Sequence, residues 1–170
     1  AKALRNDSAL KVCCGREPEG DALASQPTLS RFENRATARS CYRLAQALLE
    51  SYFVRHPRRP KQRIVLDLDT TCDPTHGQQE FGFFNAFYDE HCYLPLLVFD
   101  QDGDLLTALL QPGKPQGAKI AVAVLKRIIR RLRQQWPDIP ILVRADSGFA
   151  SPVMYRMCNT LKVDFIIGFQ

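Results

Sequence analysis

The stretch Arg63-Ile-Val-Leu-Asp-Leu-Asp-Thr70 decides the fold. Its first half is aliphatic and β-branched, which is typical of a buried strand, and two aspartates follow before the strand ends. Asp67 and Asp69 lie two residues apart, so both side chains should point to one face of the sheet. The strand is therefore expected to carry acidic groups out of the core at its C-terminal end.

The segments that follow this strand predict an α/β domain. Two apolar runs, residues 93–99 and 104–110, flank Asp102-Gly103, a pair typical of a hairpin turn. The later pattern predicts a helix over 118–136, a strand over 141–145, a helix over 151–161 and a strand over 163–169. An antiparallel start followed by two crossover helices gives a mixed sheet flanked by helices, and this order is that of the ribonuclease H-like fold.

The residues before this domain are predicted to be helical. Ser8 is placed to cap a short helix ending at Gly15, and Thr28 to cap another through Asn34. Apolar residues at three-four spacing predict an amphipathic helix over 37–56, closed by Pro57. We therefore expect an N-terminal helical segment over residues 1–60 and a partial ribonuclease H-like core over 61–170.

Composition excludes several classes of protein. The chain has 170 residues, with 23 Lys and Arg against 18 Asp and Glu, a net charge of +5. No run approaches the roughly 20 apolar residues of a membrane span, and no signal-peptide pattern is present. None of the six cysteines forms a C-x-x-C pair, which argues against a zinc cluster and for free thiols, buried or half-buried.

The acids at the strand ends predict a metal site. Asp146 directly follows the strand over 141–145, so parallel neighbouring strands would bring Asp69 and Asp146 together. Carboxylates in this arrangement suit Mg²⁺ or Mn²⁺, and Asp67 is a further candidate ligand. A single strand-end aspartate is more often a turn or cap residue, and His76 more often neither a ligand nor a proton shuttle. Trp136 and the aromatic stretch 81–88 are expected to belong to the core rather than to form a base-stacking platform.

The basic residues fall into two blocks that suit a polyanionic partner. One block spans residues 55–63 and includes Arg58, Arg59 and Lys61. The other spans residues 126–133 and includes Arg130 and Arg131, on a helix face for which solvation is the simpler interpretation and phosphate contact the alternative. With Arg144, these residues are the predicted contacts to DNA.

Four motifs in order resemble the DDE transposases of bacterial insertion sequences, specifically the insertion sequence 1380 group. The motifs are Leu23-Ala-Ser-Gln-Pro-Thr-Leu-Ser-Arg-Phe-Glu-Asn34, Val65-Leu-Asp-Leu-Asp-Thr-Thr71 with Asp73-Pro-Thr-His-Gly-Gln-Gln-Glu80, Tyr93-Leu-Pro-Leu96 and Arg144-Ala-Asp-Ser-Gly-Phe149. The resemblance implies a ribonuclease H-like core that binds divalent metal and cuts and rejoins double-stranded DNA. It also implies two Mg²⁺ or Mn²⁺ ions in the complete protein, a homo-oligomer on DNA, and a location in the bacterial cytoplasm, with the nucleoid.

The resemblance assigns roles to individual acids. Asp69 is the first catalytic aspartate and Asp146 the second, while Asp67 competes with Asp69 for the first role. Asp69 is preferred because it lies nearest the strand end and two threonines follow it. The third acid of the family, a glutamate on a later helix, would lie beyond Gln170, so we expect a fragment that is weak or inactive alone.

Two alternatives stay open at this point. Asp67, Asp69 and Thr71 also match the Asp-x-Asp-x-Thr motif of haloacid dehalogenase-like phosphatases, with Asp67 as the nucleophile. The Ser/Thr, Lys and acidic pair that such a phosphatase needs are not evident around Asp146. The other alternative is a DNA-binding module without catalytic activity.

Overall fold

The computed structural model describes residues 3–60, 62–114 and 118–169, so the predicted DNA contact Lys61 lies outside the described residues. The chain forms two compact units, Ala1–Arg43 and Leu44–Gln170, which we describe separately. The predicted domain limits, 1–60 and 61–170, stay a prediction. The boundary between the compact units falls inside the helix Ala38–Arg55, so the C-terminal part of this helix belongs to the unit that contains the sheet.

The first unit is helical, as predicted, but its two short helices begin earlier than expected. It contains a 3₁₀ turn (Leu4–Asn6), α1 (Ser8–Cys13), α2 (Gln26–Glu33) and the start of α3 (Ala38–Arg55). Asp7, not Ser8, caps α1 through a carboxylate that accepts a hydrogen bond from the backbone N–H of Leu10 at 2.7 Å. Pro27 occupies the first turn of α2, so this helix starts before Thr28 rather than after it.

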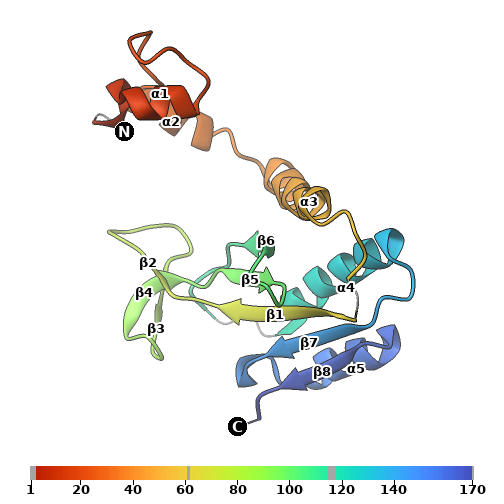
Figure 1. The fold of residues 1–170 in the computed structure, drawn as a ribbon. Coiled ribbons are helices and arrows are strands. Elements are labelled where there is room, and N and C mark those ends of the chain that lie inside the picture. Colours follow the sequence, from red (N-terminus) through yellow and green to blue (C-terminus); the bar gives the residue numbers. More distant parts are fainter. Residues whose placement is uncertain (1–2, 61, 115–117, 170) are drawn as a thin grey trace. The chain divides into compact units, whose positions relative to one another are not determined.

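The second unit is built on a mixed five-stranded sheet, as predicted (Figure 1). Its strand order is β6-β5-β1-β7-β8, with the strands β1 (Ile64–Thr70), β5 (Leu96–Phe99), β6 (Leu105–Leu109), β7 (Ile141–Ala145) and β8 (Asp164–Ile167). β1 and β6 both pair antiparallel with β5, whereas β1, β7 and β8 run parallel. This is the ribonuclease H-like arrangement, and the parallel strands present their C-terminal ends at one edge.

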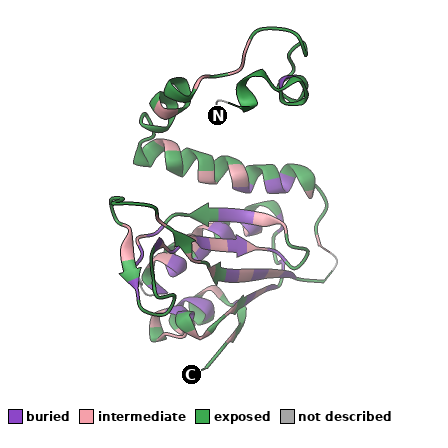
Figure 2. Cartoon of the chain, turned by 90° about the vertical axis from the view of Figure 1, so that its left-hand side faces the viewer, coloured by how far each residue is buried: buried purple, intermediate pink, exposed green. Residues whose placement is uncertain are grey.

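Helices α4 (Ala118–Gln135) and α5 (Pro152–Leu161) supply the core on one face of the sheet. Alternate residues of β1 and β7 point into it, including the fully buried Leu66 and Val143. Figure 2 shows the resulting alternation of buried and less buried residues along the strands. Asp67 and Asp69 belong to the opposite, less buried face, as their spacing predicted.

The C-terminal half of α3 packs against the end of α4. Tyr52 and Phe53 are buried, and their rings lie edge-on to Trp136 with centroids 6.5 and 5.2 Å away. Trp136 is a core residue, as predicted. This half of α3 therefore belongs to the same hydrophobic core as the sheet.

A second, three-stranded sheet follows the C-terminal end of β1. Its order is β2-β4-β3, formed by β2 (Asp73–Pro74), β4 (Glu90–Tyr93) and β3 (Phe83–Asn85). The single strand predicted over 93–99 is wrong: Pro95 has no N–H for a ladder, so the run divides into β4 and β5. We refer to β2, β3 and β4 as the small sheet.

Two glycines occupy positions where a side chain would be strained or would clash, one in a turn and one at a close approach of two backbone segments. Gly103 has a φ of 87° in the predicted β5–β6 hairpin turn, a conformation that favours glycine. Gly113 is buried against the small sheet, where a Cβ atom would lie 2.0 Å from the carbonyl oxygen of Cys92. The segment before α4 therefore meets the small sheet backbone to backbone.

Two further sequence expectations have structural answers. Cys92 and Cys158 are buried free thiols as expected, but Cys13, Cys14 and Cys41 are exposed, because the short helices of the first unit leave them uncovered. In the described residues, no helix combines the length and apolarity needed to cross a membrane.

Candidate functional site

The register of β1 and β7 brings Asp69 and Asp146 together. Asp67 is the partner of Arg144 and Leu68 the partner of Ala145 in this parallel pair. Asp69 and Asp146 directly follow these last paired residues, on neighbouring parallel strands that lie about 4.8 Å apart. Asp69 and Asp146 are both exposed, and we call them the acid pair.

Asp67 lies one step back on the same face but is already neutralised. Arg144 binds it with two parallel hydrogen bonds, Nε to Oδ1 at 2.5 Å and Nη2 to Oδ2 at 2.6 Å. Because Asp67 favours the charged guanidinium, it raises the pKa of Arg144. Both carboxylate oxygens of Asp67 accept hydrogen bonds from Arg144, and the positive charge of Arg144 balances the negative charge of Asp67.

The acid pair has the donor chemistry of a divalent cation site. Oδ1 of Asp146 accepts a hydrogen bond from the backbone N–H of Gly148 at 2.9 Å, which caps the 3₁₀ turn Ser147–Phe149 and fixes the carboxylate. Asp69 forms no ion pair with any residue in the described parts of the chain. Two carboxylates with oxygens to spare, open to water, fit Mg²⁺ or Mn²⁺, which take carboxylate and water ligands.

Tyr88 stands next to the acid pair. Its pKa is raised, first by burial of the phenol and then by the negative charges of Cys72, Asp69, Asp146 and Cys92. Tyr88 lies in the turn between β3 and β4.

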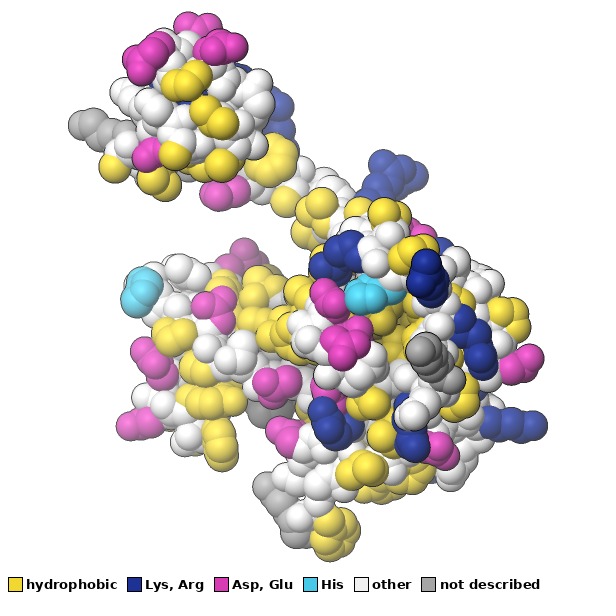
Figure 3. All heavy atoms as spheres, in the orientation of Figure 1, with side chains coloured by type: hydrophobic (Ala, Val, Ile, Leu, Met, Phe, Trp, Pro, Cys, Tyr) yellow, Lys and Arg dark blue, Asp and Glu magenta, His cyan; other side chains and the backbone are white. Residues whose placement is uncertain are grey.

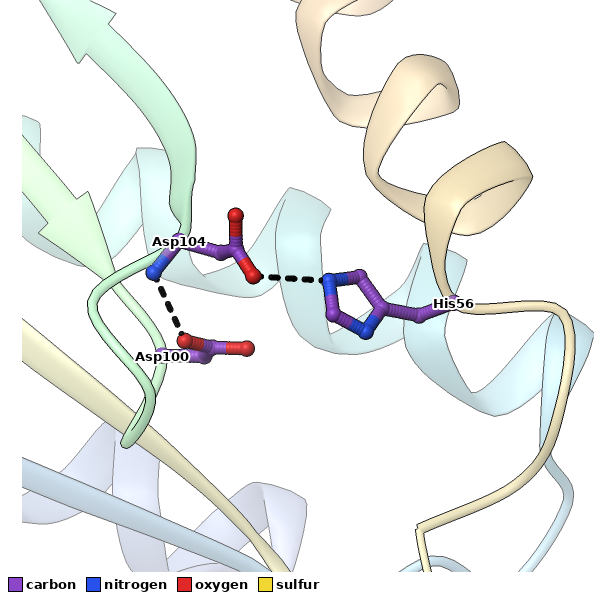
Figure 4. Close-up of side chains that lie close together, drawn as sticks. All are labelled: His56, Asp100 and Asp104. Atoms are coloured by element: carbon purple, nitrogen blue, oxygen red, sulfur yellow. Dashed lines mark hydrogen bonds and ion pairs between the residues drawn. The ribbon is translucent and has the colours of Figure 1, made fainter.

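A second acidic cluster lies at the opposite end of the sheet, where β1 begins. His56, Asp100 and Asp104 offer ligand atoms within 4.8 Å of one another (Figure 4). Asp100 is buried: its Oδ1 accepts from the N–H groups of Asp102 and Asp104, both at 2.9 Å, and its Oδ2 accepts from the Tyr52 hydroxyl at 3.0 Å.

Asp104 is satisfied in the same way. Arg55 Nη1 lies 3.1 Å from its Oδ1 and His56 Nε2 lies 2.8 Å from its Oδ2. All four carboxylate oxygens of Asp100 and Asp104 therefore have protein partners. We refer to His56, Asp100 and Asp104 as the hairpin cluster, because they tie the end of α3 to the β5–β6 turn.

The predicted DNA contacts lie away from the acid pair or are already paired. Arg58 and Arg59 are exposed before β1, and Arg59 Nη2 lies 3.4 Å from the carbonyl oxygen of Asp138, just before β7. Arg131 pairs with both oxygens of Glu50 at 2.6 Å, and Arg130 is exposed on α4. Lys114 Nζ lies 4.6 Å from the ring centroid of Phe83 in the small sheet, whereas most Lys and Arg side chains of the sheet-bearing unit that are visible in Figure 3 lie away from that sheet.

The sequence analysis missed two contributors to the site. Tyr88 was assigned to the core with its aromatic neighbours, yet Phe81, Phe84, Phe87 and Tyr88 are exposed because the small sheet has too little area to bury them. The pairing of Arg144 with Asp67 was missed because it joins residues 77 positions apart. The position of Arg144 two residues before Asp146, on the same strand face, was the only available hint.

Comparison with solved structures finds transposases and an integrase assembly. The catalytic domain of Mos1 mariner transposase is 16% identical, with a TM-score of 0.44, over 77% of this chain and 61% of that one. The Mos1 transposase paired-end complex with left transposon end is 14% identical, with a TM-score of 0.42, over 94% of this chain and 53% of that one.

A simian T-cell lymphotropic virus intasome in complex with PP2A regulatory subunit B56 gamma is 18% identical, with a TM-score of 0.41, over 71% of this chain and 40% of that one. The chain thus spans less than two thirds of each of these three. A search of curated proteins found no match.

The sequence profile of one protein family matches the whole chain. The family is described as "Transposase DDE domain group 1", and the match covers residues 1–170. Together with the acids at the ends of β1 and β7 and the strand order of the sheet, this match identifies the chain as a member of the DDE transposase domain family.

Proposed function

We propose that this chain supplies the first two metal-binding acids of a transposase that cuts DNA strands and joins them to a target. Asp69 is the first acid and Asp146 the second. The observation that carries the proposal is the convergence of two exposed carboxylates at the ends of adjacent parallel strands, beside an Asp67 that Arg144 already pairs.

Each residue has a part that follows from its contacts. Asp69 and Asp146 would hold Mg²⁺ or Mn²⁺, and the bound ions would activate a water and stabilise the leaving oxygen in phosphodiester cleavage. Gly148 fixes the Asp146 carboxylate. Arg144 cancels the charge of Asp67, so that three like charges do not crowd one edge. The strand end released by cleavage then attacks target DNA through its 3′ hydroxyl.

The finer assignments belong to the same proposal. The four sequence motifs support membership of the insertion sequence 1380 group, and hence a bacterial cytoplasmic protein that acts at the nucleoid as a homo-oligomer on double-stranded DNA. Arg58, Arg59, Lys61, Arg130, Arg131 and Arg144 are the proposed DNA contacts. β1 is seven residues long, or about 20 Å, so Arg58 and Arg59 would hold DNA roughly that far from the acid pair.

The family resemblance also implies a third acid, a glutamate on a helix, and we propose no residue of this chain for that role. Glu80 and Glu90 are exposed residues of the small sheet and its loop and do not lie on a helix. The proposal for this chain is therefore a two-acid metal site with weak or no strand cleavage by itself.

The phosphatase alternative has no support from the geometry. A nucleophilic Asp67 needs a carboxylate oxygen free to attack phosphorus, and Arg144 holds both. The family match also favours the transposase. Hydrolysis of a small phosphomonoester by the wild-type chain, lost in Asp67→Asn, would restore the alternative.

Metal binding by the chain itself tests the assignment. Isothermal titration calorimetry with Mn²⁺ should show binding that is about 100-fold weaker or lost in Asp69→Asn and in Asp146→Asn, because each variant removes a charged ligand. Asp67→Asn is the matched control, since it removes the same charge from a position that Arg144 occupies, and it should keep its Mn²⁺ affinity.

Two results would contradict the proposal. Unchanged Mn²⁺ binding in both Asp69→Asn and Asp146→Asn would leave a non-catalytic DNA-binding module as the better description. Loss of binding in Asp67→Asn alone would move the first acid to Asp67. In a protein with the third acid present, strand cleavage should follow the same pattern as Mn²⁺ binding.

A further inference from the structure

An ion pair lies one step behind the acid pair on the less buried face of the sheet. Asp67 precedes Asp69 by two residues on β1, and Arg144 precedes Asp146 by two residues along β7. Residues two apart share a face and lie about 6.6 Å from each other along a strand. The parallel register sets Asp67 opposite Arg144. A ligand held by the acid pair would therefore have this ion pair as its immediate neighbour.

The geometry of the ion pair is one that a DNA phosphate can reproduce. Arg144 donates to Asp67 through two parallel hydrogen bonds, from Nε at 2.5 Å and from Nη2 at 2.6 Å. Arginine binds carboxylates and phosphates alike through this planar, bidentate arrangement. The Asp67 carboxylate therefore orients the guanidinium as a phosphate would, and it occupies the two donors that a phosphate would use.

Both side chains can leave the ion pair without disturbing the sheet. The Arg144 side chain is 58% exposed and the Asp67 side chain 25% exposed, so water weakens their attraction. Among the described residues, neither side chain has another ion pair or hydrogen bond that would fix it. An exchange of partners therefore breaks two side-chain hydrogen bonds and leaves the backbone ladder between β1 and β7 intact.

The two ligands expected at the acid pair would draw the partners apart. A divalent cation attracts Asp67 and repels Arg144, whereas a DNA phosphate does the reverse. If only one ligand binds, the exchange leaves either Asp67 or Arg144 without a partner. If both ligands bind, Asp67 gains the cation and Arg144 gains the phosphate, so no charge is left unpaired.

We infer that Asp67 and Arg144 form a displaceable pair, in which a DNA phosphate takes Arg144 and thereby frees Asp67 for the divalent cation at the acid pair. This inference rests on the proposed function, because the acid pair is what brings cation and DNA to this edge. It adds a positive coupling between the two ligands, and by linkage each ligand must strengthen the binding of the other by the same factor. Asp67 thus binds the protein in the DNA-free chain and the metal in the DNA-bound chain.

DNA binding without metal tests the competition between Asp67 and phosphate. The measurement is the fluorescence anisotropy of a short labelled duplex in the presence of EDTA. Asp67→Asn should bind the duplex about fivefold more tightly than the wild type, because the carboxylate that competes for Arg144 is gone. In an Arg144→Gln background, the same substitution should give no such gain. Both side chains lie outside the hydrophobic core, so each variant is expected to fold.

Asp164→Asn is the matched control for the loss of one negative charge. Asp164 is exposed on β8, and its register partner Leu142 lies on the same face of β7 as Arg144. Within residues 3–60, 62–114 and 118–169 it forms no ion pair, so its substitution should raise DNA affinity much less than Asp67→Asn does. An equal gain in Asp164→Asn, or a gain from Asp67→Asn that persists in Arg144→Gln, would assign the effect to net charge and overturn the inference.

Addition of Mn²⁺ tests the coupling between metal and DNA. Mn²⁺ should tighten duplex binding by the wild type about fivefold more than binding by Asp67→Asn, in which no carboxylate can be released. The two proteins are compared at the same ionic strength, so that the general effect of salt on DNA affinity cancels. An equal effect of Mn²⁺ on both proteins would overturn the inference, and so would wild-type duplex affinity of Asp67→Asn in EDTA.

Failure of this inference can be told apart from failure of the proposed function. The measurement in EDTA contains no metal and does not depend on Asp69 or Asp146. Calorimetry with Mn²⁺ contains no DNA and decides whether those two acids bind metal. A wild-type chain that does not bind the duplex would overturn the displaceable pair and leave the calorimetric test of the acid pair unchanged.

Discussion

The two ends of the five-stranded sheet carry aspartates in opposite states. In the hairpin cluster, where β1 begins, all four oxygens of Asp100 and Asp104 accept hydrogen bonds or ion pairs from the protein. In the acid pair, where β1 ends, one backbone N–H contacts Asp146, and no ion pair joins either acid to another residue in the described ranges. The same side chain therefore stabilises the fold at one end and is left available for a ligand at the other.

The contrast also explains why proximity alone is a poor guide to a metal site. The hairpin cluster meets a distance criterion for three ligands. Its oxygens, however, are already committed to Tyr52, His56, Arg55 and the backbone, so a cation would have to displace several hydrogen bonds. An available oxygen, rather than a short separation, distinguishes the acid pair.

The largest expected loss of stability comes from a substitution that breaks the hairpin cluster. Asp100→Ala leaves the Tyr52 hydroxyl and two backbone N–H groups without their acceptor, so the free energy of unfolding should fall by about 2–3 kcal/mol. Asp69→Asn should be neutral or stabilising because it removes like-charge repulsion from Asp146. Urea denaturation measures both, and an equal loss in Asp69→Asn would make the acid pair a structural feature as well.

A smaller effect on stability comes from Tyr52, whose hydroxyl donates to Asp100 of the hairpin cluster. This effect depends on pH. Burial, and then the charges of Asp100 and its neighbours, raise the pKa of Tyr52 well above its usual range. A raised pKa means that the folded state holds the proton more tightly, so stability is complete below pH about 10 and falls as pH rises further.

Comparison with Tyr52→Phe isolates this contribution. At neutral pH the variant should lose about 1 kcal/mol with the hydrogen bond to Asp100. Above pH 10 its unfolding midpoint in urea should fall less steeply than that of the wild type. Identical slopes in the two proteins would show that Tyr52 does not titrate with unfolding.

His56→Ala should have a still smaller effect, because the bond between His56 and Asp104 is partly open to solvent. Both side chains are about one third exposed, so we expect a loss of about 0.5–1 kcal/mol in urea denaturation. Arg55→Ala is the control: its side chain is half exposed, and its loss should be smaller still. A larger loss in Arg55→Ala would place the main contact of Asp104 with the arginine.

The smallest effect concerns the acid pair itself. Asp69 and Asp146 help to raise the pKa of Tyr88 because their negative charges disfavour a tyrosinate nearby. Asp69→Asn should therefore lower the pKa of Tyr88, which ultraviolet titration can detect as the difference between each protein and its Tyr88→Phe counterpart. A pKa of Tyr88 that does not respond to either acid would argue against their convergence.

Local chemistry made most of the sheet-bearing unit predictable. Asp102-Gly103 encodes its hairpin turn because glycine can adopt the required positive φ. Helices α4 and α5 appear where their apolar spacing predicted, and Ser151 caps α5 through a hydrogen bond from the N–H of Met154. The acid pair was predicted from the same reasoning, since the C-terminal ends of parallel neighbours meet at one edge.

The features that escaped prediction depend on long-range register. The strands of the small sheet have two to four residues each, too few for a period to be visible, and they exist because β4 pairs on both sides. The binding of Asp67 by Arg144 requires knowledge of which strands pair and in what register. The exposure of Phe87 and Tyr88 likewise depends on how little of the small sheet is covered.

The close approach at Gly113 has a consequence for altering the protein. The small sheet is anchored there by main-chain atoms and by the amide of Asn85, so the anchor does not depend on which side chains occupy residues 86–89. These four positions form a natural cassette that can be randomised or exchanged between relatives while the frame stays in place. Gly113→Ala, by contrast, adds one methyl group against Cys92 and should dislodge the whole cassette.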